Sequence, residues 1–429
     1  MTTLEIRGGR ILRPDLSVTV GDVLVDREAG TIRAVGDVGA GDDVLDATGA
    51  LVVPGLVNAH THAAMTLLRG YADDEPLEDW LREDIWPVEA ILEPEDVRAG
   101  TDLAAVEMIR SGTTAFADMY FHMPTVVDRV EAAGLKARIA HGVVTVGKDE
   151  ADARADLEEG LSVARRFDGA ADGRVRTAFA PHSLTTVGEE YLSEFVPRAR
   201  DLGVPLHYHA NETAAEVEPI VEEHGERPLA YADDRDMLSS EDFLAHGVHL
   251  GDAEIDLLAE RGTSLVHCPA SNMKLASGMA PVQDLLDAGV GVALGTDGAA
   301  SNNDLDVFDE MRDAAMVGKL AAEDASAVPA EAVVRMATEG GNRALGFDGG
   351  RIEPGAAADL AVVDFEVPRL TPVHDHVSHL AYAATGGDVR HTVVDGAVLM
   401  RDRTVQTLDE EAVRERAAER AATLAERVA

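Results

Sequence analysis

Cysteine and long apolar runs are almost absent from this 429-residue chain. The only cysteine, Cys268, excludes a disulfide within the chain, which agrees with a reducing compartment. The sequence has no run of the ~18 apolar residues that a transmembrane helix requires. Its first residues, MTTLEIRGGR, lack the basic and then apolar pattern of a secretory leader. We therefore expect a soluble, cytoplasmic protein with no membrane partner.

Positive charge is also scarce. Lysine and arginine together number 37 against 79 aspartates and glutamates, for a net charge of −42. Such a chain would repel the phosphate backbone of nucleic acids, so we expect no nucleic-acid partner. The acidic residues are spread along the chain, as in DDEPLEDWLRED and DEADARADLEE, rather than gathered in a tail for a basic partner. A dispersed carboxylate surface with few lysines resembles proteins adapted to high salt, where self-repulsion is screened.

The two ends of the chain share a pattern that the middle lacks. Residues 1–57 alternate apolar and polar positions in short runs broken by glycine and aspartate, and residues 346–429 contain the similar stretches ADLAVVDF and VRHTVVDGAVLMRD. Such runs predict short antiparallel strands. We expect a small β-sandwich built from both ends, with a surface helix closing the chain.

Residues 58–345 alternate β-rich apolar runs with amphipathic helical stretches. Several of the helical stretches end at a glycine, such as Gly134 and Gly203, which is a helix C-cap signal. A succession of eight strand-helix units predicts a parallel (β/α)8 barrel of the α/β class. The apolar runs, in order, are LVNAHTH, TTAFADM, KARIAHGVV, RVRTAFAPHS, VPLHYHANE, LAHGVHL, TSLVHCP and VGVALGTD.

Polar residues lie at the carboxyl ends of the predicted strands, where barrel enzymes place their active sites. Side chains two apart on a strand share a face, so a His-x-His pair can reach one ion. Each pair alone is a weak signal, but matching positions on the first, fifth, sixth and eighth strands are hard to explain as core histidines. The residues at these ends are His60, His62, His207, His209, Glu212, His246, His249 and Asp297.

Imidazoles and one carboxylate form a compact site for a divalent transition ion, with zinc the first choice from ligand type. An open coordination position would hold a water and lower its pKa from ~15.7 toward ~7. Asp297 can bind the ion and accept the proton of that water. Glu212, three residues after His209, can then pass the proton to a substrate.

The stretches PGLVNAHTH, FAPHS, HANET, AHGVHL, HCPASNMKLASGMAPV and LGTDGAASNNDLDVFDEMR resemble the amidohydrolase superfamily. Within it they are most similar to the 5′-methylthioadenosine/S-adenosylhomocysteine deaminases, and the likeness continues to GRIEPGAAADLAVVD near the end of the chain. The resemblance implies one metal ion and assigns a role to each strand-end residue. The ligands would be His60, His62, His209 and Asp297, with His246 orienting the attacking water, Glu212 as proton shuttle, and His207 left to a structural role.

The same resemblance implies substrate contacts. Glu89 falls where the family has an acidic residue that accepts hydrogen bonds from ribose hydroxyls, and His182 matches a position that contacts the substrate. The family also has an arginine after the third strand. Here the candidate is Arg154, whose spacing is shifted. Cys268 is interpreted as a packing residue, because no step needs a thiolate.

These features predict hydrolytic deamination of adenosine-type nucleosides, in which metal hydroxide attacks C6 and ammonia leaves. Methylthioadenosine and S-adenosylhomocysteine are the expected substrates. Two alternatives remain open: deamination of guanine or cytosine, or dechlorination of a triazine, on the same metal site, and a non-catalytic scaffold on the same barrel. We also expect the chain to form a homo-oligomer.

Overall fold

The middle of the chain forms two parallel sheets in the computed structural model, which describes residues 2–428. The first sheet has the order β10-β8-β7-β6 with β9 beside β8, and the second has the order β11-β12-β13-β14. Their strands are β6 (Leu56–Thr61), β7 (Thr113–Tyr120), β8 (Lys136–Val143), β9 (Val175–Thr177), β10 (Ala180–Pro181), β11 (His207–Ala210), β12 (Phe243–His246), β13 (Ser264–His267) and β14 (Val292–Leu294).

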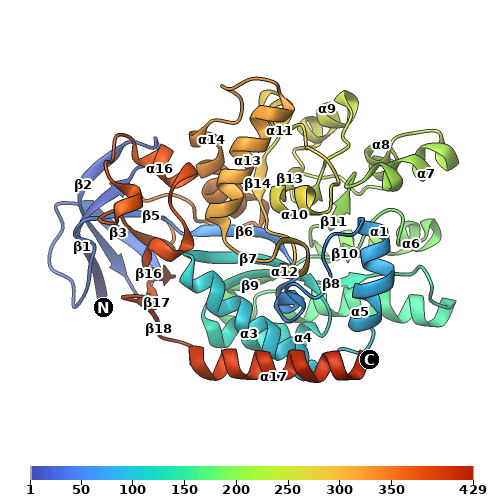
Figure 1. The fold of residues 1–429 in the computed structure, drawn as a ribbon, viewed down its shortest axis with the longest axis horizontal. Helices are drawn as coiled ribbons and strands as arrows, with labels where there is room; N and C mark the ends of the chain where they lie inside the picture. Colours follow the sequence, from blue (N-terminus) through green and yellow to red (C-terminus); the bar gives the residue numbers. More distant parts are fainter. Residues whose placement is uncertain (1, 429) are drawn as a thin grey trace.

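Hydrogen bonds connect the two sheets at both edges. On one side, isolated parallel bridges pair Phe179 with Leu206 and Ser183 with His209. On the other side, the amide of Asp297, which follows β14, donates to the carbonyl of His60 near the end of β6 at 3.0 Å. The strands follow the order of the predicted units, and the arrangement is consistent with the expected (β/α)8 barrel (Figure 1).

Helices follow the parallel strands along the chain. Gly134 and Gly203 end α4 and α6 in the left-handed region, with φ of 83° and 69°, as their positions in the sequence predicted. The helices of this region are α1 (Leu77–Asp79), α2 (Trp86–Glu89), α3 (Pro94–Arg110), α4 (Met123–Ala133), α5 (Glu150–Phe167), α6 (Glu189–Leu202), α7 (Ala214–His224), α8 (Pro228–Asp233), α9 (Asp252–Arg261), α10 (Pro269–Lys274), α11 (Val282–Asp287), α12 (Ala299–Asn302), α13 (Val307–Ala321), α14 (Ala330–Arg335) and α15 (Gly341–Ala344).

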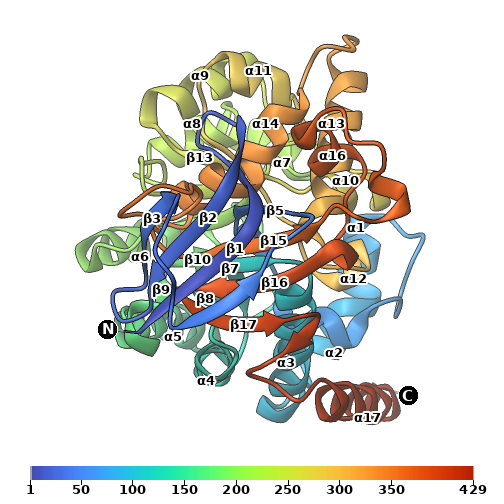
Figure 2. The same cartoon turned by 90° about the vertical axis from the view of Figure 1, so that its left-hand side faces the viewer.

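Both ends of the chain contribute to one further sheet (Figure 2). It has nine strands in the order β18-β17-β16-β15-β5-β1-β2-β3, with β4 paired to β1. Antiparallel pairing of β15 with β5 joins the C-terminal half to the N-terminal half. The strands are β1 (Thr3–Leu12), β2 (Val18–Asp26), β3 (Thr31–Gly36), β4 (Asp43–Asp46), β5 (Ala50–Pro54), β15 (Leu360–Asp364), β16 (Val389–Val394), β17 (Ala397–Arg401) and β18 (Thr404–Val405).

The prediction of a purely antiparallel end module was wrong in one respect. β1 pairs in parallel with both β4 and β5. The chain leaves β3 at the edge of the sheet and returns beside β1, so β4 and β5 run in the direction of β1. The sheet has its own buried cluster, including Leu4, Ile6 and Val362.

The chain closes with α16 (His376–Tyr382), the strands β16–β18 and the long helix α17 (Glu410–Val428). α17 lies along α3 at the lower edge of Figure 1. Arg420 pairs with Asp96 at 2.7 Å and Arg416 with Asp102 at 3.3 Å, so ion pairs tie this helix to the barrel. Within residues 2–428, no helix is both long and apolar enough to cross a membrane.

Candidate metal centre and active site

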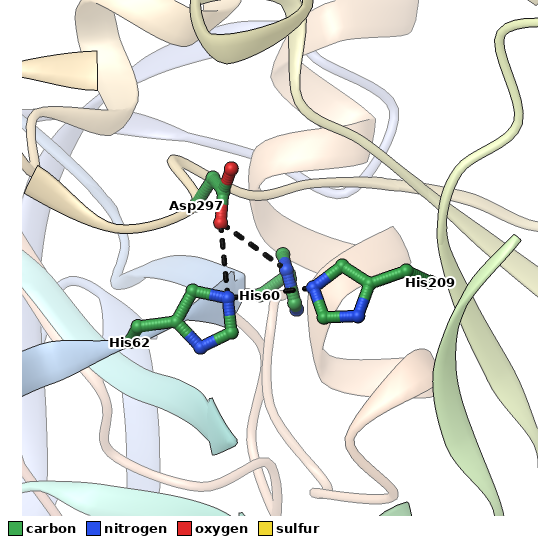
Figure 3. Close-up of side chains that lie close together, drawn as sticks. All are labelled: His60, His62, His209 and Asp297. Atoms are coloured by element: carbon green, nitrogen blue, oxygen red, sulfur yellow. Dashed lines mark hydrogen bonds and ion pairs between the residues drawn. The ribbon is translucent and has the colours of Figure 1, made fainter. Parts of the chain in front are cut away.

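Four buried side chains from distant parts of the sequence converge at the carboxyl ends of the strands (Figure 3). His60 is on β6, His62 directly follows it, His209 is on β11 and Asp297 follows β14. One ligand atom from each lies within 4.8 Å of the others. Parallel strands end at the same rim of a barrel, so residues far apart in sequence meet there.

Backbone carbonyls orient the rings of His62 and His209. Nδ1 of His62 lies 2.5 Å from the carbonyl oxygen of Met119, and Nδ1 of His209 lies 2.7 Å from that of His182. A carbonyl only accepts hydrogen bonds, so each Nδ1 carries the proton. In the neutral form of each ring, Nε2 then has a lone pair, and these two atoms face each other at 3.4 Å. This is the arrangement typical of histidine ligands to a metal.

Asp297 is held by two serines that the sequence did not single out. Its Oδ2 accepts hydrogen bonds from Ser271 Oγ at 2.7 Å and Ser301 Oγ at 2.8 Å. Its Oδ1 lies 3.2 Å from His62 Nε2 and 3.4 Å from His60 Nε2. Burial alone would raise the pKa of Asp297, but the contacts with His60 and His62 outweigh it and hold the pKa well below its usual value. The carboxylate is therefore charged at the point where the ligands meet.

The donor set fits a divalent metal ion. Within the described chain, Nε2 of His60 is buried and has no hydrogen-bond partner. An unpaired buried polar atom costs free energy, and a metal ion at this point would satisfy it. Imidazole nitrogens with one carboxylate oxygen are the ligands of many zinc sites. The residues present therefore form a metal-binding group.

Glu212 and His246 lie next to this group. Oε2 of Glu212 is 3.6 Å from Nε2 of His246, and both side chains are buried. Burial, helped by the charge of Asp297, raises the pKa of Glu212 well above its ordinary value, which favours the protonated acid. Nδ1 of His246 lies 2.9 Å from Asn272 Oδ1. His249 is directed elsewhere, with Nε2 2.8 Å from the carbonyl of Ser277.

A cavity of about 950 Å³ opens onto these side chains. It is large enough for a nucleoside-sized ligand, and Glu89 and His182 both line it. Burial raises the pKa of Glu89 to about 7, although a hydrogen bond with Tyr120 works against this shift. Part of the wall is the segment formed by α1, the π-helix Trp80–Ile85 and α2. Tyr120 is the last residue of β7, and no motif in the sequence singles it out.

Arg154, predicted as a substrate contact, does not line the cavity. It lies on α5, where its guanidinium bonds Glu194 at 2.8 Å and Glu150 at 3.2 Å. The ion pair with Glu194 holds this side chain against α6. Lys148 of that loop lines the cavity instead, with Nζ 2.8 Å from Asp156. In the sequence, the position of Lys148 just before α5 could have indicated that it lies at the cavity.

Cys268 is fully buried, and burial raises the pKa of its thiol well above the ordinary value. A thiol that stays protonated is a poor nucleophile, so its position agrees with packing.

Comparison with known proteins gives a consistent result. The amidohydrolase family profile matches residues 51–399. A 5-methylthioadenosine/S-adenosylhomocysteine deaminase of Halobacterium salinarum is 70% identical over 99% of both chains. A 5′-deoxyadenosine deaminase of Methanosarcina mazei is 48% identical over 90% of this chain and 89% of that protein. The crystal structure of an adenosine deaminase from Xanthomonas campestris with bound zinc superposes with a TM-score of 0.92 at 38% identity, covering 99% of this chain and 98% of the other.

Proposed function

This chain belongs to the amidohydrolase family, and we propose that it is a metal-dependent aminohydrolase that deaminates adenosine-type nucleosides to inosine derivatives and ammonia. The observation that carries the proposal is the convergence of four ligand atoms within 4.8 Å, beside Glu212, on one cavity. The names of the similar deaminases support 5′-methylthioadenosine and S-adenosylhomocysteine as substrates, with 5′-deoxyadenosine and adenosine as related candidates.

His60, His62, His209 and Asp297 would hold the ion, for which we propose zinc. When bound, the ion would lower the pKa of a water molecule and so supply a nucleophile for C6 of the purine. Asp297 would accept the proton of the attacking water and deliver it to the departing amino group, which leaves as ammonia. Glu212, whose pKa is raised by burial, donates a proton to N1 of the ring, and His246 orients the water.

Cavity residues would hold the rest of the nucleoside. Glu89 accepts hydrogen bonds from the ribose hydroxyls, and His182 contacts the substrate from the rim of the barrel. In place of Arg154, we assign to Lys148 the contact with an anionic group at the 5′ end of a substrate. A free base or a triazine has no ribose diol, so the proposed role of Glu89 favours a nucleoside over these alternatives.

Three features of the whole chain complete the proposal. We assign residues 58–345 to the catalytic barrel, residues 1–57 to the N-terminal part of an accessory β-sandwich, and residues 346–429 to its C-terminal part with a terminal helix. The chain assembles as a homo-oligomer, which light scattering after gel filtration would check. With a net charge of −42, it works best in molar salt, where the screening length falls to ~3 Å.

The decisive experiment measures ammonia release from 5′-methylthioadenosine, S-adenosylhomocysteine, 5′-deoxyadenosine, adenosine and guanine in high salt. We expect release from the nucleosides, loss of activity after metal is removed with a chelator, and recovery with zinc. Activity on guanine alone would overturn the substrate assignment. Purified protein that takes up no metal and releases no ammonia would favour a scaffold.

A further inference from the structure

His207 makes a direct contact with the proposed metal ligand His60. Nε2 of His207 lies 2.8 Å from Nδ1 of His60, and both rings are buried, at 1% and 0% exposure. The other ring nitrogen of His207, Nδ1, lies 2.7 Å from the carbonyl oxygen of Phe243. The ring also stacks on the Phe243 ring, with centroids 4.1 Å apart. His207 and Phe243 are paired across neighbouring strands, so this geometry is built into the register of β11 and β12.

The carbonyl of Phe243 fixes the donor and the acceptor in both of these hydrogen bonds. The carbonyl of Phe243 only accepts, so Nδ1 of His207 must carry a proton. A neutral imidazole has one N–H, and a charged ring buried among other histidines would be costly. Nε2 of His207 is therefore an acceptor, and Nδ1 of His60 must be the donor to it. This leaves Nε2 of His60 with a lone pair that points toward the other three ligands.

The other two histidine ligands are oriented by backbone carbonyls directly, with no second side chain between. His62 and His209 donate directly to the carbonyls of Met119 and His182, and those carbonyls can only accept. For His60 the acceptor is a second imidazole, which can either donate or accept. The tautomer of His207 must therefore be fixed by another contact, and the hydrogen bond to the carbonyl of Phe243 fixes it.

We propose that His207 is a positioning residue that transmits the hydrogen-bond polarity of the Phe243 carbonyl to His60 and so keeps Nε2 of His60 unprotonated for metal binding. This inference rests on the proposed metal site. It replaces the purely structural role that the sequence comparison left to His207.

The test compares zinc binding to metal-free protein, measured by competition with a chromogenic chelator. His207→Leu removes the acceptor and should weaken zinc binding roughly 10- to 100-fold, as loss of a hydrogen-bond partner to a metal ligand typically does. His207→Gln should rescue the affinity to within about threefold, because an amide can accept from His60 and donate to a carbonyl. The matched control is His267→Leu. His267 is also a buried strand-end histidine, and in the described chain its ring nitrogens have no hydrogen-bond partner, so the affinity should not change.

A spectroscopic measurement on the unchanged protein tests the tautomer of His60 without a substitution at His207. In metal-free protein with ¹⁵N-labelled histidine, the His60 proton should reside on Nδ1, with His60→Asn used for assignment. A proton on Nε2 of His60, or a His207→Leu variant that folds and binds zinc as tightly as the unchanged protein, would overturn the inference. Failure of the proposed function gives a different result, because the unchanged protein would then bind no zinc at all.

Discussion

Oε2 of Glu212, a residue that lines the substrate cavity, lies 3.6 Å from Nε2 of His246 beside the metal-binding group. Neither residue is among the four ligands, so the proton chemistry and the metal binding can be separated by mutation.

Glu212→Gln should retain its metal and lose turnover. The amide keeps the size of the side chain but cannot deliver a proton to the ring, and general acid catalysis contributes typically ~10²- to 10⁴-fold. The measurement pairs kcat for ammonia release with zinc content by elemental analysis. Glu218→Gln, an exposed change on α7, serves as control. Undiminished activity of Glu212→Gln would remove Glu212 from the mechanism.

The pH dependence of kcat/KM should follow the ionisation of the Glu89 carboxyl. Burial raises its pKa to about 7, so the group loses its charge as the pH falls through that value. The ionised form is the better acceptor for ribose hydroxyls, and kcat/KM should therefore fall below pH ~7. Glu89→Gln should lower kcat/KM about 10- to 100-fold at pH 8, the value of a hydrogen bond to a charged group, and remove this acid limb. An unchanged acid limb in the variant would assign it to another residue.

Substitution of Lys148 should change the preference between two substrates, whereas substitution of Arg154 should not. Lys148→Met should raise KM for S-adenosylhomocysteine, which carries a carboxylate at its far end, and leave KM for 5′-methylthioadenosine nearly constant. Because Lys148 is partly exposed and paired with Asp156, we expect only about a 2- to 5-fold effect. Arg154→Met is the matched control and should change neither KM, since its guanidinium bonds Glu194 and Glu150 away from the cavity. The reverse result would restore the role first predicted for Arg154.

Lys136 should contribute strongly to the stability of the fold. Its buried ammonium on β8 lies 2.6 Å from Asp359 and 2.7 Å from Asp395, and so links the barrel to the terminal sheet. Lys136→Met leaves Asp359 buried without its partner and should lower the free energy of unfolding by about 3–5 kcal/mol. Denaturant unfolding in high salt would measure the loss. Lys136→Met combined with Asp359→Asn should recover part of it, whereas equal loss in both variants would argue against an electrostatic origin.

Much of the candidate site could be predicted from local patterns. His60 and His62 share one face of a strand because side chains alternate with a period of two. Asp297 follows the last β-rich run of the middle region, and the carboxyl ends of parallel strands must meet at one rim. Glu212 follows His209 closely in the chain, so the two were bound to lie near each other. None of these conclusions required the register between strands.

The tertiary structure decided which partners those residues have. The contact of His207 with His60 joins residues 147 positions apart, and it depends on the register of the strands around the barrel. The serines that hold Asp297, the hydrogen bond between Tyr120 and Glu89, and the turn of Arg154 away from the cavity depend in the same way on packing between elements. The parallel pairing of β1 with β4 and β5 was decided by the path of the connecting chain, which strand periodicity does not encode. The sequence by itself determined which residues reach the rim of the barrel, because periodicity acts over neighbouring positions. Only the assembled fold determined how each ring and carboxylate is held, because hydrogen-bond direction depends on atoms brought together from distant segments.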